Sequence, residues 1–225
     1  MKIKVNNIEL FYEKIGEGQP LILLHGNSED HHTFDKLVKQ LKNHFTIYAI
    51  DSRNHGESQK IGDFSYEAMA KDLECFIKKL QINFPSIIGF SDGAIIALTL
   101  AIKDNSLLGK LVLLGVNLKP SDFTEKSYNF IKSYYDKTKS PYFKLMLEAP
   151  NIEVEDIKNI NNPTLLIAGE KDIIKKELYE KMAQTLPNNK MIILDKQNHD
   201  SYVKDNDMLY PILMEFLEKN KKLGE

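Results

Sequence analysis

The feature that most constrains the fold is a series of short, unbroken apolar runs spread along the chain. The runs are PLILLHG (20–26), FTIYAID (45–51), PSIIGF (85–90), KLVLLGV (110–116), PTLLIAG (163–169) and KMIILD (190–195). Strands that are apolar on both sides are typical of a parallel sheet with both faces covered. Segments with helical spacing lie between the runs. One of them follows Ser65, and a serine just before the periodic residues predicts a helix N-cap. Strands that alternate with helices predict an α/β fold.

Two segments depart from this alternation. At the N-terminus, KIKVNN and IELFYEKIG alternate apolar and polar residues around an asparagine pair, which predicts an antiparallel hairpin at a sheet edge. Between Asn117 and Asn162 no buried strand is indicated, and aromatic residues recur at helical spacings on both sides of Pro141. A chain of 225 residues suits one domain with a large core. We therefore predict a single domain, 1–225, with a small helical cap insertion at approximately 117–162.

The composition of the chain limits which kinds of partner and which cellular compartment can be predicted for it. The net charge of -2 comes from 30 basic and 32 acidic residues spread along the chain, so no nucleic-acid partner is predicted. The apolar runs are far shorter than the roughly 20 residues that cross a bilayer, so no membrane association is predicted. The charged N-terminus lacks the apolar core of a signal peptide, and Cys75 is the only cysteine. These features predict a cytoplasmic protein; protein partners are left open.

A nucleophile is predicted where the third long apolar run ends. Functional groups in open parallel sheets gather beyond the carboxyl ends of the strands. There, Ser91 in GFSDG follows PSIIGF and precedes the apolar segment AIIALTLAI. This is the GxSxG pattern of a nucleophile elbow, a sharp strand-to-helix turn that exposes the serine hydroxyl. Because a serine hydroxyl is a poor nucleophile at neutral pH, Ser91 needs a base and a group that orients the base.

The chain offers few candidates for these two partners. His199, in the loop KQNHD after the last apolar run, is the only histidine after residue 55. Asp172 lies just beyond PTLLIAG, in GEKDII, and Glu170 and Asp195 are rivals for the acid. The order serine, aspartate, histidine is one of the known triad orders. The sequence therefore predicts a triad of Ser91, Asp172 and His199.

Acyl transfer also places negative charge on the former carbonyl oxygen, which requires preorganised donors. The backbone amide of Asp92 lies at the positive end of the helix after the nucleophile, and Asn27 in LLHGNSED can contribute a second amide. We predict that these two N–H groups form an oxyanion hole. His25 is interpreted as a turn-packing residue, and no acidic or thiol partner stands at ligand spacing from His25, His31 and His32, so no metal site is predicted.

Taken together, LILLHGN, IDSRNHGES, GFSDGA, GEKD and NHD resemble the α/β-hydrolase superfamily, in order and across nearly the whole chain. The resemblance implies a three-layer fold: an eight-stranded, mostly parallel sheet with an antiparallel second strand, helices on both faces and a small helical cap after the sixth strand. It also implies hydrolysis without a cofactor. The segment DSRNHGES is mostly structural in the family, and the planar fork of Arg53 suits that role. Asn198 and Ala94 replace glycines common in the family, and neither removes a catalytic group.

Asp92 raises a second question, because an aspartate after the nucleophile also resembles the biphenyl-hydrolase-like, amino-ester-cleaving branch of the superfamily. A carboxylate near the acyl pocket would favour an ammonium group on the substrate. In the alternative interpretation only the backbone amide of Asp92 acts, and its side chain caps or pairs with neighbouring groups. The sequence leaves both alternatives open.

The sequence thus predicts a carboxylesterase-like serine hydrolase that cleaves a small carboxylic ester, or a related acyl compound, through an acyl-enzyme. The predicted partner is a small ester-like molecule. Because one fold hosts many reactions, two alternatives stay open. The first is a carbon–carbon bond hydrolase, thioesterase or lyase that uses the same triad, and the second is a ligand-sensing protein with residual hydrolase activity.

Overall fold

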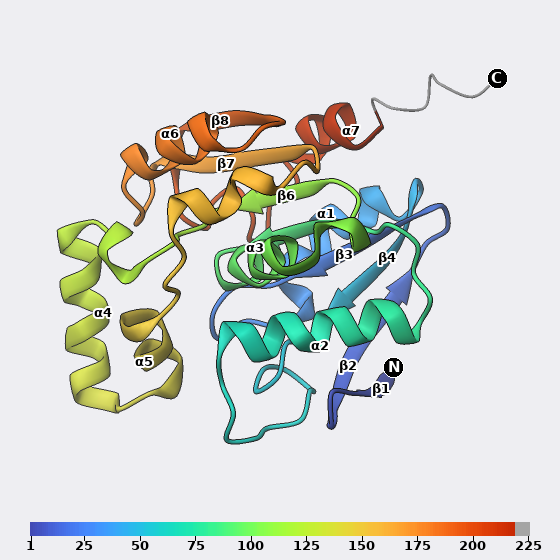
Figure 1. Ribbon diagram of the computed structural model, residues 1–225, viewed down its shortest axis with the longest axis horizontal. Helices are drawn as coiled ribbons and strands as arrows, with labels where there is room; N and C mark the ends of the chain where they lie inside the picture. The colour runs from blue at the N-terminus through green and yellow to red at the C-terminus, as the bar shows by residue number, and fades with distance from the viewer. Residues whose placement is uncertain (219–225) are drawn as a thin grey trace.

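A computed structural model describes residues 1–218 as an α/β fold around one eight-stranded sheet (Figure 1). The strand order is β1-β2-β4-β3-β5-β6-β7-β8. β2 runs antiparallel to both of its neighbours, and all pairs from β4 to β8 are parallel. This confirms the predicted mostly parallel sheet with an antiparallel second strand. The strands are β1 (Lys2–Val5), β2 (Ile8–Ile15), β3 (Gln19–Leu24), β4 (Phe45–Ile50), β5 (Ser86–Phe90), β6 (Leu111–Leu114), β7 (Thr164–Lys171) and β8 (Asn189–Asn198). Residues 219–225 of the predicted domain lie outside the described part.

The edge of the sheet is the predicted hairpin of β1 and β2. Val5 pairs with Ile8, and the two residues between them, Asn6 and Asn7, both have positive φ angles, 41° and 63°. A two-residue turn with both φ angles positive matches the right-handed twist of the flanking strands, and asparagine tolerates this conformation better than most residues do. The asparagine pair therefore sets the register of the hairpin.

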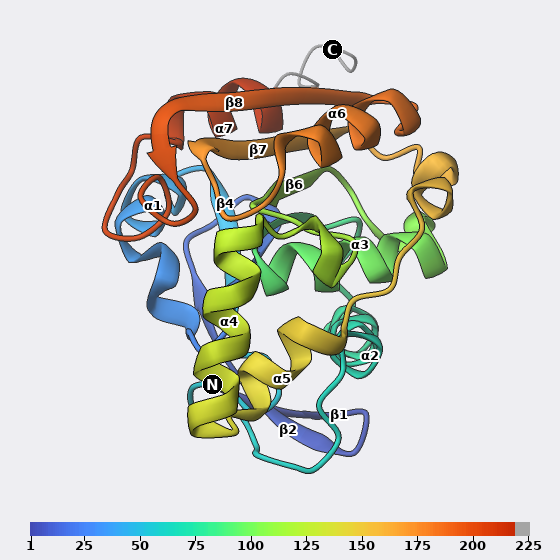
Figure 2. The same cartoon turned by 90° about the vertical axis from the view of Figure 1, so that its left-hand side faces the viewer.

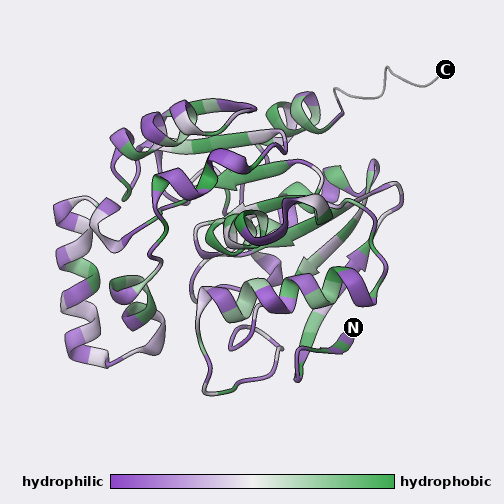
Figure 3. Ribbon diagram, viewed as in Figure 1, coloured by the Kyte–Doolittle hydropathy of each residue, from purple (hydrophilic) through white to green (hydrophobic). Residues whose placement is uncertain are grey.

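Helices cover both faces of the sheet, as the unbroken apolar runs predict. One core cluster joins the sheet to α2 (Tyr66–Lys79), α3 (Asp92–Asp104) and α6 (Lys176–Thr185), and a second joins it to α1 (Asp35–Leu41) and α7 (Tyr210–Glu218). In Figure 1, α2 and α3 lie in front of the sheet, and Figure 3 shows that the central strands are largely hydrophobic. Within residues 1–218, none of the helices combines the length and apolar character that a membrane crossing requires.

Between β6 and β7 the chain forms the helical pair α4 (Glu125–Thr138) and α5 (Pro141–Glu148), which lies to the left of the sheet in Figure 1 and in front of it in Figure 2. The pair is joined by stacked rings of Tyr134 and Phe143, whose centroids are 4.3 Å apart. Of the residues in α4, only Ile131 is buried. Pro141 begins α5, where a proline costs no backbone hydrogen bond. The pair contributes little to the core, and its inward side is available to line a site.

Arg53 joins the loop after β4 to the face covered by α2. Its Nε and Nη2 atoms donate to the two carboxylate oxygens of Asp72 at 2.6 and 2.7 Å, and its Nη1 atom donates to Asp63 at 3.0 Å. The guanidinium is buried, and a two-pronged contact of this kind is beyond the reach of a lysine. The structure therefore agrees with the structural role expected for Arg53.

Candidate active site

Ser91 lies at a sharp turn between β5 and α3. Its backbone has φ 50° and ψ −114°, a sparsely populated conformation for a residue with a side chain. The turn is held from both sides, because the Ser91 N–H donates to the carbonyl of Leu114 at 2.8 Å and the Ser91 carbonyl accepts from the N–H of Ala94 at 2.9 Å. Such a turn lifts the hydroxyl above the carboxyl end of the sheet.

The two glycines of GFSDG make this turn possible. A Cβ atom on Gly89 would overlap the backbone of Gly93, and a Cβ atom on Gly93 would overlap the carbonyl group of Leu24 in the neighbouring strand β3. The start of α3 therefore crosses the sheet at backbone contact distance. The spacing of the motif follows from this close packing, and only glycine fits at both positions.

The structure brings the three residues of the predicted triad together. His199 Nε2 lies 3.1 Å from Ser91 Oγ, and His199 Nδ1 lies 2.7 Å from Asp172 Oδ1. When Nδ1 donates to the carboxylate, Nε2 carries the lone pair that can accept the serine proton. Asp172 is itself held by two backbone donors, the N–H groups of Ile174 at 3.2 Å and Gly169 at 3.3 Å. The arrangement can deprotonate Ser91 and orient the ring that does so.

The two rivals for the acid lie elsewhere. Glu170 is exposed and accepts a hydrogen bond from the backbone N–H of Lys196 at 2.9 Å. Asp195 is also exposed, and its carboxylate lies 3.7 Å from the ammonium group of Lys196. Neither carboxylate has a hydrogen bond to His199 in the part of the chain that the structure describes. Among the three acids that the sequence offered, the geometry therefore selects Asp172.

Gly115, which sequence reasoning missed, makes room for the histidine. It follows β6 with φ 61°, and a Cβ atom at this position would lie 2.6 Å from Cε1 and 2.9 Å from Nδ1 of His199. The sequence signal was a glycine directly after an apolar run, which marks a strand end but does not reveal which side chain needs the space. A side chain here would displace the imidazole ring from its place between Ser91 and Asp172.

Replacing Gly115 by alanine is therefore expected to lower kcat by about 100-fold, the usual cost of a misplacement of about 1 Å in an active site. The Michaelis constant should change little, because the cavity wall is untouched. The measurement is steady-state hydrolysis of an aryl ester by folded protein, checked by circular dichroism. Gly62→Ala is the matched control, because no atom lies within 4 Å of a Cβ at that exposed position. A Gly115→Ala protein with wild-type kcat would contradict the expected steric conflict.

Two buried tyrosines, Tyr179 and Tyr202, interact electrostatically with Asp172. Burial and the negative charge of Asp172 raise the pKa of both phenols well above the ordinary value. Both hydroxyls lack a hydrogen-bond partner among the side chains and backbone of residues 1–218. The two phenols are therefore neutral at physiological pH. Their positions depend on contacts between distant segments, which the sequence pattern does not reveal.

The loop after β3 supplies the two predicted oxyanion donors together with α3. In the described part of the chain, the backbone N–H groups of Asn27 and Asp92 have no hydrogen-bond acceptor. The N–H of Asp92 is among the first of α3, where an α-helix leaves its donors unpaired. Both N–H groups are thus free to donate a hydrogen bond. Asn27 lines the same cavity as Ser91.

His25 holds the start of this loop. Its Nε2 atom accepts the N–H of Ser52 at 3.1 Å, so its Nδ1 atom carries the proton and donates to the carbonyl of Gly26 at 2.7 Å. Burial lowers the pKa of His25, which keeps the ring neutral in this role. His25 therefore packs the turn, as the sequence interpretation states.

His55 holds Ser28, on the other side of Asn27, in the same way. Its Nε2 atom accepts the N–H of Ser28 at 3.2 Å, and its Nδ1 atom donates to the carbonyl of Arg53 at 3.0 Å. Burial, with a smaller contribution from the neighbouring His25, lowers the pKa of His55 to about 4. The ring is therefore neutral at physiological pH, so the loop rests on two uncharged imidazoles.

Ser91 and His199 open into a cavity of about 650 Å³ beneath the α4–α5 pair. One wall is apolar and comes from the helical pair, with Phe130 the most exposed of its rings at 64%. The charged side chain of Glu29, which also lines the cavity, is paired with Lys204 at 2.6 Å. A volume of this size suits a small organic molecule. The apolar residues of the wall are Phe130, Ile131, Phe143 and Met146.

The carboxylate of Asp92 does not line this cavity. The residue is only 4% exposed, and its two carboxylate oxygens accept hydrogen bonds from Tyr66 Oη at 2.8 Å and Asn27 Nδ2 at 2.9 Å. Burial raises the pKa of Asp92 to about 6, partly offset by these two donors. The side chain therefore lies behind the nucleophile, on the side of α2.

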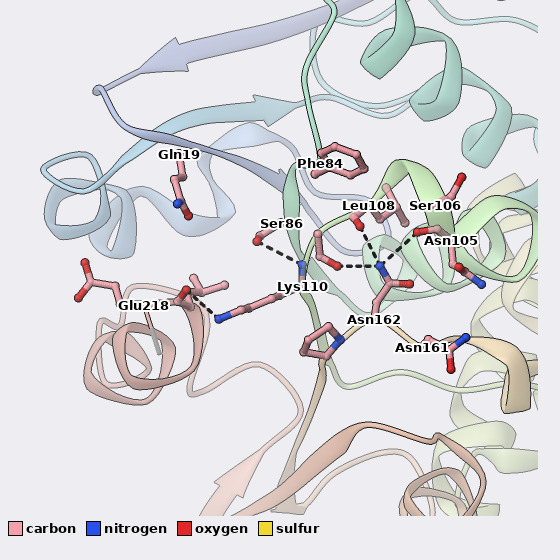
Figure 4. A pocket seen from close by; sticks show the side chains of 13 residues that line it. Gln19, Phe84, Ser86, Asn105, Ser106, Leu108, Lys110, Asn161, Asn162 and Glu218 are labelled. Atoms are coloured by element: carbon pink, nitrogen blue, oxygen red, sulfur yellow. Dashed lines mark hydrogen bonds between the residues drawn. The ribbon is translucent and has the colours of Figure 1, made fainter. Parts of the chain in front are cut away.

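A second cavity, of about 500 Å³, lies at the opposite, amino end of the parallel strands (Figure 4). Its polar groups join loops to one another. Asn162 Nδ2 donates to the carbonyls of Asn105, Leu108 and Gly109 at 3.2, 2.8 and 2.9 Å, and Lys110 Nζ donates to two carbonyls at the end of α7. This cavity therefore belongs to the structural framework, and the cavity at Ser91 is the candidate active site.

The fold and the site together define a class of protein: a mostly parallel α/β sheet with a serine elbow, an acid and a histidine at its carboxyl edge. Residues 19–145 match the family described as alpha/beta hydrolase fold, and the chain belongs to this family. This confirms the superfamily that the sequence motifs resemble.

Relatives and solved structures agree with this assignment. The human serine hydrolase BPHL is 26% identical over 252 residues, and the match covers 96% of this chain and 86% of the human protein. The Bacillus subtilis protein YisY of the AB hydrolase superfamily is 24% identical over 256 residues, and the match covers 93% of this chain and 96% of YisY. A meta-cleavage product hydrolase from Pseudomonas fluorescens superposes with a TM-score of 0.80 at 19% identity, covering 97% of both chains. An esterase from Thermogutta terrifontis superposes with a TM-score of 0.80 at 22% identity, and the match covers 97% of this chain and 98% of the esterase. At these identities the superpositions show the shared fold.

Proposed function

We propose that the protein is a serine hydrolase that cleaves a small carboxylic ester. The observation that carries this proposal is the hydrogen-bonded series Ser91, His199 and Asp172, with distances of 3.1 and 2.7 Å, at the floor of a cavity. His199 Nε2 takes the proton of Ser91, and Oγ attacks the ester carbonyl carbon. The C–O bond to the leaving alcohol then breaks as His199 returns the proton. Water, deprotonated by the same histidine, hydrolyses the acyl-enzyme and frees Ser91.

The two free backbone donors complete this mechanism. The N–H groups of Asn27 and Asp92 stabilise the negative oxygen of each tetrahedral intermediate, and the dipole of α3 adds to the donor at Asp92. Both are fixed before the reaction, because one begins a helix and the other lies between Gly26 and Ser28, which two buried histidines hold. Preorganised donors do not have to rearrange as charge develops on the oxygen.

The cavity supports a substrate with an apolar group. The wall formed by Phe130, Phe143 and Met146 can bury a short aliphatic or aromatic acyl group next to Ser91. The names of two similar proteins, a serine hydrolase and an esterase, support ester cleavage. Thioester and carbon–carbon bond cleavage would use the same three residues, so a substrate panel should include both. Selection of amino esters by Asp92 stays a prediction.

Reaction with a fluorophosphonate probe and with p-nitrophenyl acetate tests the proposal. We expect hydrolysis of the ester above the uncatalysed rate and covalent labelling of one residue, which peptide mass spectrometry should place at Ser91. Both results follow from a serine with an adjacent base and oxyanion donors. A folded protein that neither hydrolyses short-chain aryl esters nor accepts the probe would contradict the proposed function.

A further inference from the structure

The buried carboxylate next to the nucleophile has fixed partners on two sides. On one side, Tyr66 of α2 donates its hydroxyl to Asp92 Oδ1 at 2.8 Å, and the Tyr66 ring is fully buried. On the other side, Asn27 donates its side-chain amide to Asp92 Oδ2 at 2.9 Å. Charge-assisted hydrogen bonds to a carboxylate are stronger than those between neutral groups, and a low local dielectric strengthens them further. The carboxylate is therefore a rigid connection between α2 and the loop after β3.

The side chain of Asn27 is fixed at both of its polar atoms. Besides Asp92, its Nδ2 atom donates to the carbonyl of Tyr142 in α5 at 3.3 Å, and its Oδ1 atom accepts from the hydroxyl of Ser28 at 2.9 Å. The hydroxyl of Tyr142 in turn donates to the carbonyl of Asn54 at 2.6 Å. A side chain fixed in this way also fixes the backbone of its own residue. The backbone of Asn27 carries the N–H group assigned above to the oxyanion hole.

We propose that Asp92 is a positioning residue: its carboxylate, oriented by Tyr66, holds Asn27 so that the backbone N–H of Asn27 points at the oxyanion. This inference rests on the proposed hydrolase function. It assigns a role to Tyr66, which lies far from GFSDG in the sequence. It also accounts for a carboxylate that is buried beside a nucleophile without reaching the substrate cavity.

The positioning role and the amino-ester interpretation differ in what the charge does. A carboxylate that recognises an ammonium group must face the substrate and keep its negative charge. A positioning carboxylate needs only two acceptor atoms in the right places. An asparagine at position 92 can supply one acceptor to Asn27 and an NH₂ group to the Tyr66 oxygen, which has lone pairs to accept it. Asp92→Asn thus removes the charge and keeps the connection, whereas Asp92→Ala removes both.

The test compares Asp92→Ala, Asp92→Asn and Tyr66→Phe on a neutral aryl ester and on its amino-substituted analogue. We expect Asp92→Ala to lower kcat on the neutral ester by about 10- to 100-fold, somewhat less than the loss of a whole oxyanion donor. The Michaelis constant should stay within about threefold, because the interaction matters only in the transition state. Tyr66→Phe should also lower kcat, and Asp92→Asn should keep most of the kcat that Asp92→Ala loses. Tyr48→Phe is the matched control, because it removes a hydroxyl from a buried ring on the same face of the sheet.

Hydrogen exchange of the amides of residues 25–29 provides a readout that does not depend on activity. Faster exchange in this loop is expected in Asp92→Ala and Tyr66→Phe, and exchange close to wild type in Asp92→Asn and Tyr48→Phe. The inference is overturned if Asp92→Ala leaves both kcat and loop exchange within twofold of wild type. It is also overturned if Asp92→Asn is as impaired as Asp92→Ala, or loses only the amino ester. Absence of ester hydrolysis in the wild type would contradict the proposed function, and the exchange measurement would still decide whether Asp92 holds the loop.

Discussion

Replacing Ser91 by alanine is expected to lower kcat for ester hydrolysis by about 10⁶-fold, to the residual rate that binding and oxyanion donors alone provide. Ser91 Oγ is the only hydroxyl hydrogen-bonded to His199 Nε2 in residues 1–218, so no neighbouring group can replace it as the nucleophile. The fluorophosphonate adduct should also be absent from Ser91→Ala, because the hydroxyl that forms it has been removed. Both are measured on the same preparation, by initial rates and by intact-protein mass spectrometry.

Ser86→Ala is the matched control for this variant. Ser86 begins β5, the strand that ends just before Ser91, and its hydroxyl accepts the N–H of Lys110 at the opposite end of the sheet. It should keep wild-type kcat and full labelling. If Ser91→Ala retained more than a few per cent of the wild-type kcat, a nucleophile other than Ser91 would have to be sought.

Replacing Asp172 by asparagine is expected to lower kcat by about 10⁴-fold while leaving the fold intact. An amide at this position would direct its NH₂ group at His199 Nδ1, which now lies 2.7 Å from a carboxylate oxygen. The ring would then place its proton on Nε2, and a protonated Nε2 cannot accept the proton of Ser91. The measurement is kcat against pH, together with thermal unfolding to verify that the protein is folded.

Glu170→Gln and Asp195→Asn are the controls, because these two residues were the other acids that the sequence offered. Both carboxylates are exposed and point to Lys196. Each substitution should change kcat by less than about twofold, as is usual for surface positions. A larger loss in either control than in Asp172→Asn would show that the acid has been assigned to the wrong residue.

Those parts of the fold and site that depend on local sequence could be predicted. The apolar runs gave each buried strand to within a few residues, because a strand with both faces covered needs a continuous apolar segment. The elbow was recognisable because its glycines, its serine and the flanking strand and helix are contiguous in GFSDG. His199 and Asp172 lie beyond strand ends, and the topology of a parallel sheet places such ends along one edge.

Features that depend on contacts between distant segments could not be predicted. Asn27 and Tyr66 meet Asp92 from segments 65 and 26 residues away, and no local pattern relates the three side chains. The need for a glycine at position 115 depends on the imidazole of His199, which lies far along the chain. The sequence did indicate a helical insertion, but the side of α4 and α5 that faces Ser91 is decided by how the pair packs.

The backbone conformation of Ser91 has a consequence for protein engineering. At φ 50° and ψ −114° a glycine would be free of strain, whereas a residue with a Cβ atom lowers the stability of the fold by about 1–3 kcal/mol. A selection for heat resistance alone would therefore favour loss of the hydroxyl at position 91. Any campaign to raise the melting temperature of this protein has to select for turnover in the same step, because the proposed nucleophile is also a position of backbone strain.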